Sequence, residues 1–415
     1  MKKYLYVLFG VLSLFILCRC GNEKEEIVHT EKNGDAENLK GQDKAWKAIK
    51  KFAEKVNGKE SRSGVFDLSK LTITKVEKEI ISIEELQQSF ARSTESINTD
   101  VVTYRFTFEK EGKQGFAIAT DDERINRVLA FVEEGSLADT AIIPGMAYMV
   151  KRFQDVLAYD LDTYYSEGPQ TYEFMQEWTL RPCLKTQWHK GEPYNNNYKT
   201  PTSPCGETDN GKYQASSTAI SIAQCVANYP QDYDIPAMLL KKYNIAQLVA
   251  QSKIYATDTD LAPKVAAFVK EFDPDKTTKF DCKGSSTEII NVMSVLAALG
   301  FGNNYASYQN KHDIIKTFKG LRWDCPTVYG VFSGDSRNQA EGWVVDGFWG
   351  MVNSDVTKIE LTSVHCIFAF GGMGNGWYSN PSEPIDPNGK PVYDHNQCTF
   401  KASLHFRPVC PWCVE

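Results

Sequence analysis

The sequence lacks a large excess of charge of either sign, and this limits the class of partner. Its 46 Lys and Arg residues stand against 53 Asp and Glu residues, a formal net charge of -7, and the two signs are interspersed. A basic surface for nucleic acid is therefore not expected. With 42% hydrophobic and 12% aromatic residues the composition is not that of a disordered chain, so 415 residues predict one large domain or two.

The chain also lacks an internal repeat and a long hydrophobic run. The apolar stretch of residues 4–17 is too short for a transmembrane helix, and it follows Lys2-Lys3. This pattern is typical of a secretory signal peptide, here residues 1–20. Cys20, just after the stretch, resembles the lipidation site of bacterial lipoproteins, with Cys18 as the alternative. We therefore expect secretion across the inner membrane and a lipid anchor in the outer membrane or at the cell surface.

Residues 21–42 are polar and acidic, which predicts a flexible tether between the anchor and the folded chain. The acidic start of this segment resembles the surface-export signals of Bacteroidetes lipoproteins.

The nine remaining cysteines lack the spacing of a small disulfide framework or of a paired zinc site, so no metal or other cofactor is expected. Their odd number predicts at least one free thiol. Cys410 and Cys413 resemble a redox dithiol, but their place near the chain end favours a tail disulfide or an inert pair. The nine are Cys183, Cys205, Cys225, Cys282, Cys325, Cys366, Cys398, Cys410 and Cys413.

Folding is expected to begin near Asp43, a candidate N-cap. Trp46, Ile49, Ala53 and Val56 then have helical spacing. Alternating aromatic residues at 104–108, a turn at 111–113 and a buried run at 115–120 predict a β-hairpin. Residues 43–165, with the turn at Asp121-Asp122 and the later Gly135-Ser136, resemble the propeptide, or streptopain-inhibitor module, that precedes a family of bacterial peptidases.

The segment from Gln214 to Pro230 predicts a tightly packed helix over about residues 213–229. Ala219, Ile222, Ala223 and Val226 recur at helical spacing, and Asn228-Tyr229-Pro230 ends the pattern. The segment resembles the central helix of the streptopain family, secreted papain-like cysteine peptidases, in which Gly-Cys-Val-Ala-Thr-Ala leads to a closing Asn-Tyr-Pro. The ungapped match places the catalytic cysteine of the family at Ala215.

Further stretches resemble the family in the same order along the chain. The resemblance implies a papain-like domain over residues 175–415, with a helical half and an antiparallel sheet half from about Pro326. The complete expectation is an α+β fold in which an α+β propeptide-like module precedes this two-part domain. The matching stretches are residues 184–195, 284–301, 326–331, 343–347 and 371–378.

The other catalytic positions of the family are also changed. The resemblance implies that the general-base histidine falls on Glu341, its orienting asparagine on Ile367, the covering tryptophan on Phe368 and the oxyanion-hole glutamine on Lys190. A thiol protease needs a thiolate and an imidazole, and Ala215 supplies no nucleophile. We expect Glu341 to be a solvated surface acid. We expect His365 to be a structural histidine whose hydrogen bonds are satisfied, and Cys366 to be a packed cysteine rather than a reactive one.

These substitutions predict a pseudopeptidase that binds a peptide or protein in its cleft. Aromatic candidates for the cleft are Trp343, Phe368, Phe370, Trp377 and Tyr378, each of which is also a good core residue. One alternative is an active peptidase with a rearranged site, with Cys225, Cys205 or Ser216 as the nucleophile. The other is a protease inhibitor that acts in trans through its N-terminal module.

Overall fold

The computed structural model describes fifteen stretches of the chain, which divides into two compact units, Met1–Gly41 and Gln42–Glu415. All elements below belong to the second unit, α2 from Gln42 onward. The described stretches are residues 34–57, 70–83, 98–125, 127–169, 171–202, 208–228, 235–274, 278–281, 284–286, 289–301, 306–309, 314–322, 327–332, 340–380 and 400–406.

The N-terminal region, residues 42–169, holds one sheet between helices. The predicted hairpin is confirmed: at its turn both Glu111 and Gly112 have positive φ, 53° and 77°, which suits the twist of a tight hairpin. The elements of this region are α2 (Gly34–Asn57), β1 (Thr72–Ser82), β2 (Asp100–Lys110), β3 (Lys113–Thr120), β4 (Val128–Val132), the 3-10 helix η2 (Leu137–Ala141), α4 (Pro144–Lys151) and α5 (Phe153–Glu167).

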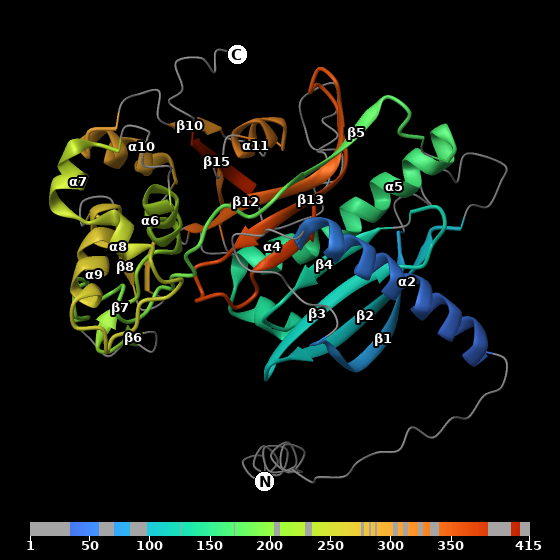
Figure 1. The fold of residues 1–415 in the computed structure, drawn as a ribbon, viewed down its shortest axis with the longest axis horizontal. Helices are drawn as coiled ribbons and strands as arrows, with labels where there is room; N and C mark the ends of the chain where they lie inside the picture. Colours follow the sequence, from blue (N-terminus) through green and yellow to red (C-terminus); the bar gives the residue numbers. More distant parts are fainter. Residues whose placement is uncertain are drawn as a thin grey trace, which may run out of the picture. The chain divides into compact units, whose positions relative to one another are not determined.

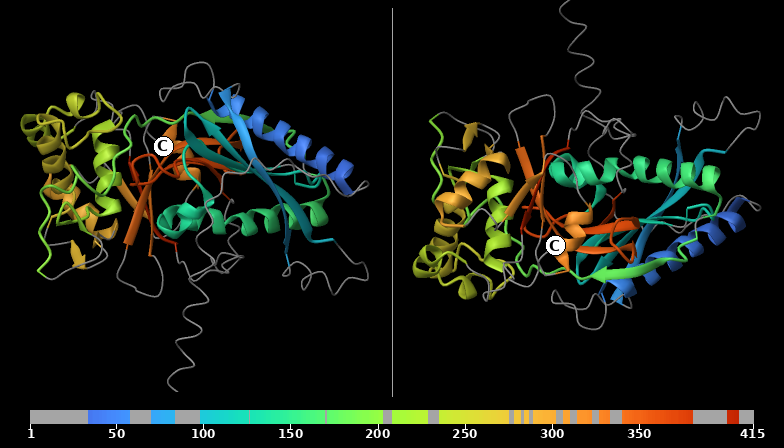
Figure 2. Two further views of the ribbon diagram at one scale, coloured as in Figure 1. Left: turned by 90° about the horizontal axis from the view of Figure 1, so that it is seen from below. Right: turned by 90° about the horizontal axis from the view of Figure 1, so that it is seen from above.

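Alternation along these strands gives the sheet two buried faces. One face carries Phe106, Phe108 and Phe131 and packs against α2. The other carries Phe116 and Val132, among others, and packs against α4 and α5. Figure 2 shows α2 and α5 on opposite sides of the sheet. Side chains of successive residues point to opposite faces of a strand, so both layers are filled from one sequence.

The C-terminal region, residues 171–406, consists of a helical part followed by a mostly antiparallel sheet. Its elements are β5 (Met175–Leu180), β6 (Thr208–Asp209), β7 (Lys212–Tyr213), α6 (Ser217–Asn228), α7 (Ala237–Lys242), α8 (Ile245–Leu248), α9 (Leu261–Glu271), β8 (Lys279–Asp281), β9 (Gly284–Ser286), α10 (Ile289–Ala298), β10 (Ala306–Gln309), α11 (Ile314–Leu321), β11 (Thr327–Phe332), β12 (Ala340–Asn353), β13 (Ile359–Ile367), β14 (Gly376–Ser379) and β15 (Phe400–Phe406).

The sheets of the two regions are continuous. Eleven described strands form one sheet in the order β1-β2-β3-β4-β14-β13-β12-β11-β15-β10, with β5 paired to β12. The junction is antiparallel, with Val132 opposite Gly376 and Phe131 opposite Trp377. Figure 1 shows β4 beside the strands of the C-terminal region, with α4 across them. A Cβ on Gly145 of α4 would lie 2.9 Å from both Phe368 and Trp343, so this helix packs closely on the C-terminal strands.

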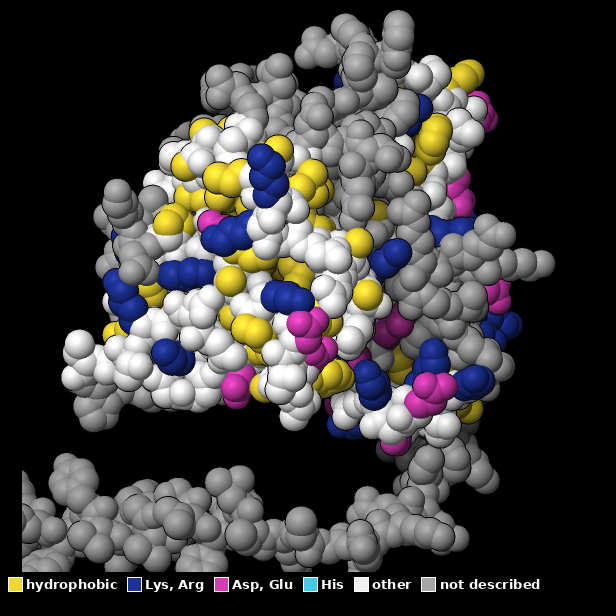
Figure 3. Space-filling model, turned by 60° about the vertical axis from the view of Figure 1, so that its left-hand side comes forward, with side chains coloured by type: hydrophobic (Ala, Val, Ile, Leu, Met, Phe, Trp, Pro, Cys, Tyr) yellow, Lys and Arg dark blue, Asp and Glu magenta, His cyan; other side chains and the backbone are white. Residues whose placement is uncertain are grey.

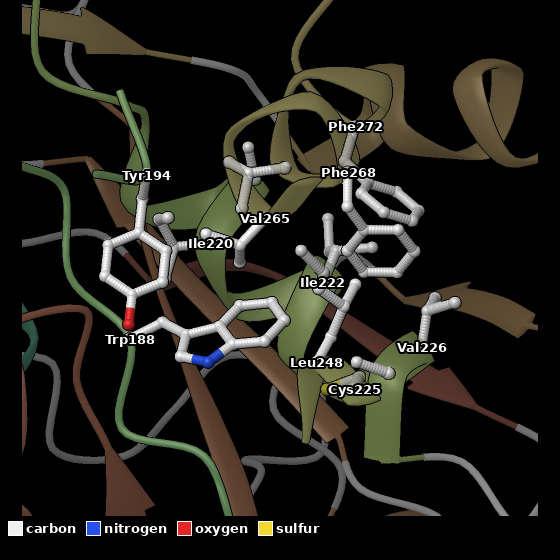
Figure 4. Close-up of a cluster of buried hydrophobic side chains, with 14 of the residues drawn as sticks. Trp188, Tyr194, Ile220, Ile222, Cys225, Val226, Leu248, Val265, Phe268 and Phe272 are labelled. Carbon is white, nitrogen blue, oxygen red and sulfur yellow. The ribbon is translucent and has the colours of Figure 1, made fainter. Parts of the chain in front are cut away.

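The helical part encloses α6 (Figure 4). Trp188 and Phe268 are fully buried beside Ile220 and Ile222 of α6. On the outer surface of the helical part, Met238 and Leu240 of α7 are half exposed and Tyr255 is 64% exposed. Figure 3 shows apolar and basic side chains intermingled on this side of the molecule.

The α+β class expected from the sequence is confirmed, with two local differences. The predicted central helix is α6, but it begins at Ser217, so Ala215 precedes it. The helix predicted from Asp43 begins at Gly34 instead, so the prediction of Asp43 as N-cap is wrong. Residues 34–42 contain Ala36, Leu39 and Lys40, good helix formers that extend the helix upstream.

Candidate functional site

The start of α6 is built from short polar side chains. The hydroxyl of Ser216 accepts the N–H of Ala219 at 3.0 Å, the contact of an N-cap residue. Ala215, directly before it, is fully buried, and its N–H donates to the carbonyl of Lys190 at 2.8 Å. Ala215, predicted at the nucleophile position, therefore lies beside Lys190, predicted at the oxyanion-hole position.

Buried Asp273 holds this turn in place. Its Oδ2 accepts the N–H of Ser216 at 3.2 Å and the hydroxyl of Tyr198 at 2.5 Å, while its Oδ1 accepts the hydroxyl of Thr278 at 2.5 Å. Ser285 donates to the carbonyl of Gln214 at 2.6 Å. A carboxylate at a helix N-terminus is favoured by the unpaired N–H groups and the helix dipole. Sequence reasoning missed Asp273, whose only local signal is the Asp-Pro after an amphipathic helix.

Strand β12 lies directly on the first turn of α6 at Gly342. The N–H of Gly342 donates to the hydroxyl of Ser217 at 3.0 Å, and its carbonyl accepts the hydroxyl of Ser221 at 3.1 Å. A Cβ on Gly342 would lie 2.8 Å from Cα of Thr218. Only glycine permits this approach, which brings the preceding residue, Glu341, to the start of α6.

Glu341 forms an ion pair with Lys190, with Nζ and Oε1 3.6 Å apart and side chains 17% and 16% exposed. The expectation that Glu341 is a solvated surface acid is wrong, because the contact at Gly342 draws β12 onto α6 and Lys190 lies within reach. The ammonium of Lys190 also lies 4.5 Å from the ring centroid of Phe370. The structure thus brings together three of the predicted catalytic positions, Ala215, Lys190 and Glu341, and places Phe370, a predicted cleft aromatic, beside them.

Ile367 and Phe368 belong to the hydrophobic core. Ile367 is paired with Val344 rather than with Glu341, and it is 3% exposed in the same core cluster as Ala215. Phe368 is 1% exposed and packs against α4. Trp343, Trp377 and Tyr378 are buried as well, so of the aromatic cleft candidates only Phe370 is partly exposed and contacts the ion pair.

The described alternative nucleophiles are enclosed. Cys225 is fully buried in the core of the helical part (Figure 4). Ser216 is fully buried and its hydroxyl oxygen is occupied by the helix cap. Cys205, Cys410 and Cys413 lie outside the described residues, as do Cys18 and Cys20 of the signal segment.

His365 has a carboxylate partner, as expected of a structural histidine. Its Nδ1 lies 2.6 Å from Oδ1 of fully buried Asp346, whose Oδ2 accepts the N–H of Leu184 at 3.1 Å. Cys366 beside it is buried, and burial together with the nearby Asp346 charge raises the pKa of its thiol well above the usual range. Both residues therefore behave as packing and positioning groups around β12 and β13.

The described part of the chain holds no group of three or more His, Cys, Asp or Glu side chains suited to a metal ion. It also has no helix long and apolar enough to cross a membrane. The arrangement around Ala215 offers charge and hydrogen bonds, while Ala215 itself has no atom that attacks a carbonyl.

Comparison with known proteins identifies the N-terminal region. Residues 38–171 match the Spi protease inhibitor family. No curated protein and no solved structure matches the chain. The matched range begins within α2 and ends just past α5, so it covers the helices and the β1–β4 sheet of the N-terminal region. Residues 38–171 are a protease-inhibitor-like, or propeptide-like, module.

Proposed function

We propose that this chain is a catalytically inactive relative of the streptopain-type cysteine peptidases, and that it binds a peptide or protein at the start of α6. The observation that carries the proposal is the set of contacts around Ala215. The N–H of Ala215 donates to the carbonyl of Lys190, and the side chain of Lys190 forms an ion pair with Glu341. These are the positions at which the resemblance expects a thiol, an oxyanion donor and an imidazole.

The chemistry of the three residues supports binding rather than turnover. Peptide cleavage by a thiol protease requires a thiolate, a general acid for the leaving amine and a donor for the oxyanion. A carboxylate at Glu341 cannot replace the imidazolium, and its negative charge opposes a thiolate. Lys190 is a donor for a ligand carbonyl or carboxylate, and Phe370 adds an aromatic surface.

The inhibitor-like module packs closely on the C-terminal region, which supports its retention in the mature protein. Family maturation depends on self-cleavage, for which Ala215 provides no nucleophile. The module shares a sheet with the C-terminal region through β4 and β14, and a core cluster containing Phe116, Met149 and Trp343. We therefore propose that the module is a permanent part of the protein.

The proposal is tested by assaying the purified chain with casein, with fluorogenic peptides and with an epoxide that traps papain-type thiolates. No turnover and no labelling are expected. Ala215→Cys alone is also expected to be inactive, because Glu341 is not an imidazole. Ala215→Cys with Glu341→His, Ile367→Asn and Lys190→Gln is the minimal restoration. Turnover by the unmodified chain that is lost in Cys225→Ala or Ser216→Ala would refute the proposal.

Binding is tested separately with a peptide library displayed against the immobilised chain. Selected peptides should bind about tenfold more weakly to Lys190→Ala, the loss of one charge-assisted contact, and equally well to Lys264→Ala, an exposed lysine on α9. If neither Lys190→Ala nor Glu341→Gln changes the affinity for the selected peptides, the binding site lies elsewhere.

The lipid anchor is a further part of the proposal. Cys20→Ala should shift the protein from the membrane fraction to the soluble fraction, with Cys18→Ala as the matched control. The reverse result would assign the lipid to Cys18.

Inhibition in trans is the second candidate, favoured by the family match over residues 38–171. The full chain would then reduce the rate of an active papain-like peptidase at stoichiometric concentration. Absence of inhibition at a large molar excess would remove this candidate.

A further inference from the structure

The ammonium of Lys190 and the carboxylate of Glu341 lie close together without a hydrogen bond between them. Nζ and Oε1 are 3.6 Å apart, which is beyond hydrogen-bond distance. Within the part of the chain that the structure describes, neither charged group has a hydrogen bond to another residue, and the ammonium otherwise faces the ring of Phe370. The described residues therefore leave the N–H donors of the ammonium and the oxygens of the carboxylate unused.

Burial makes these unused groups costly. The two side chains are only 16% and 17% exposed, so most of the water that would hydrate them is excluded. A buried ion pair is stable when further hydrogen bonds fill its remaining donors and acceptors. The remaining exposure also keeps both groups within reach of a molecule that arrives from solvent. The pair thus has the properties of a binding site whose hydrogen bonds a ligand completes.

The charges of the pair limit the chemistry of the ligand group that lies between them. A ligand carboxylate would be attracted by Lys190 but repelled by Glu341, and a ligand ammonium would meet the opposite combination. The favoured group is neutral. It accepts a hydrogen bond from Lys190 and donates one to Glu341, with its acceptor and its donor side by side to match two atoms 3.6 Å apart.

A primary carboxamide has this arrangement. Its carbonyl oxygen and its NH2 group lie next to each other at the end of one planar group. A trans backbone amide directs its C=O and its N–H to opposite sides, so it cannot meet both residues at once. We infer that the Lys190–Glu341 pair recognises an asparagine or glutamine side chain of the bound peptide. The inference rests on the proposed binding of a peptide at the start of α6, and it adds the type of residue that is recognised there.

A library of hexapeptides, acetylated at the N-terminus and ending in an N-methylamide, tests the inference against the immobilised full chain. These ends remove terminal charges and terminal carboxamides. The selected peptides should carry glutamine or asparagine at one fixed position. Replacing that residue with methionine, glutamate or lysine should weaken binding about tenfold, measured by fluorescence polarisation.

A double variant shows whether this preference comes from the pair. The chain with Lys190→Met and Glu341→Leu should bind the glutamine peptide and its methionine replacement equally. The matched control, Lys264→Met with Asp260→Leu, changes an exposed ion pair on the same half of the molecule and should keep the tenfold preference.

Single charge variants should reverse the preference, which an unfolded protein cannot do. Glu341→Gln leaves the Lys190 ammonium without an opposing carboxylate, so this variant should bind the glutamate peptide more tightly than the glutamine peptide. Lys190→Gln leaves the carboxylate alone and should favour the lysine peptide. Both results follow from the charge that remains.

The outcomes separate this inference from the proposed function. If no peptide is selected, the proposed peptide binding and the inference both fail. If the selected peptides depend on Lys190 but have no fixed glutamine or asparagine, the inference alone is overturned. It is also overturned if the glutamine preference persists in the double variant, or if Glu341→Gln and Lys190→Gln keep the preference of the unmodified chain.

Discussion

At the residue scale, the Lys190–Glu341 pair places two opposite charges beside buried Ala215. Both side chains are mostly buried, so each stabilises the other against the cost of leaving water. Removing one partner leaves a poorly solvated charge, whereas removing both leaves none. The pair is thus expected to matter more for the conformation of the α6 start than for net stability.

We predict that Lys190→Met and Glu341→Leu each lower the free energy of unfolding by about 1–3 kcal/mol. The double variant Lys190→Met with Glu341→Leu should be close to neutral, because no buried charge remains. Urea unfolding of the unmodified chain, the two single variants and the double variant gives a double-mutant cycle. The exposed pair Lys264–Asp260 is the control, and Lys264→Ala should cost less than about 1 kcal/mol. Additive single effects would show that the two side chains do not interact.

Cys366 provides a second prediction at this scale. Because burial raises the pKa of its thiol well above the usual range, the folded protein keeps it neutral through mildly alkaline pH. Alkylation with iodoacetamide at pH 8.5, read by peptide mass spectrometry, should leave Cys366 unmodified in the folded chain and label it fully in urea. The buried Cys183 and Cys225 should follow the same pattern. Rapid labelling of the folded chain would mean that β13 opens readily.

At the element scale, the corner between β3 and β4 is held by Asp122 and Arg124. Arg124 donates to Asp122, to the hydroxyl of Tyr165 at 2.7 Å and to the carbonyl of Asp100 at 2.8 Å. Burial opposes ionisation of Asp122, but the hydrogen bonds from Arg124 outweigh it, so the pKa of this carboxyl lies below its ordinary value. The corner therefore depends on pH.

A depressed folded-state pKa contributes stability that is present above the unfolded pKa and is lost as the pH falls through the folded value. Asp122→Asn should therefore lower the free energy of unfolding by about 1–2 kcal/mol at pH 7. The difference from the unmodified chain should shrink as the pH falls below about 4. Denaturant unfolding across this range measures it. A difference that does not vary with pH would assign the effect of the variant to packing.

The contact between α6 and β12 gives another prediction for these elements. Gly342→Ala places a Cβ where Cα of Thr218 lies 2.8 Å away, so the strand and helix must separate. We expect a loss of about 1–3 kcal/mol, the usual cost of overpacking, and faster hydrogen exchange at the amides of residue 342 and Ala219, which donate to the hydroxyls of Ser217 and Ser216. An unchanged exchange rate would show that β12 adjusts without moving from α6.

The regular elements were largely predictable because their patterns are local. The alternation at Phe106 and Phe108 and the turn at Gly112 specify the β2–β3 hairpin, and Ala219 to Val226 specify α6. The start of α2 was not predictable, since residues 34–42 belong to the polar, acidic segment for which a flexible tether was predicted, whereas the structure has them helical. The burial of Glu341 and the role of Asp273 depend on contacts between segments far apart in sequence, such as Gly342 with Thr218, which no local pattern reports.

At the scale of the whole molecule, residues from Gln42 onward form one compact unit in which the inhibitor-like module is a structural component. Two contacts join it to the C-terminal region: β4 is hydrogen-bonded to β14, and α4 packs against Phe368 and Trp343. Burial of apolar surface dominates such an interface. The two regions are therefore expected to unfold together.

This expectation is tested by inserting a site-specific protease sequence between Gly168 and exposed Pro169, in the segment that joins α5 to β5. After cleavage the fragments should co-elute in gel filtration without denaturant and separate in urea. Gly145→Val, which forces α4 away from Phe368, should release the N-terminal fragment after the same cleavage, whereas exposed Glu109→Gln should not. Separation of the unmodified fragments without denaturant would contradict permanent association of the module.

The position of β14 in the chain has a consequence for the order of folding. β4 is made early during synthesis, but the strand that completes its pairing, Gly376–Ser379, is made near the other end of the chain. Until then β4 has an open edge, which is a template for pairing with another molecule. Contacts so distant in sequence also form slowly. Chains truncated before Gly376 are therefore expected to aggregate through this edge, and the growing chain depends on protection of β4 until its last strands arrive.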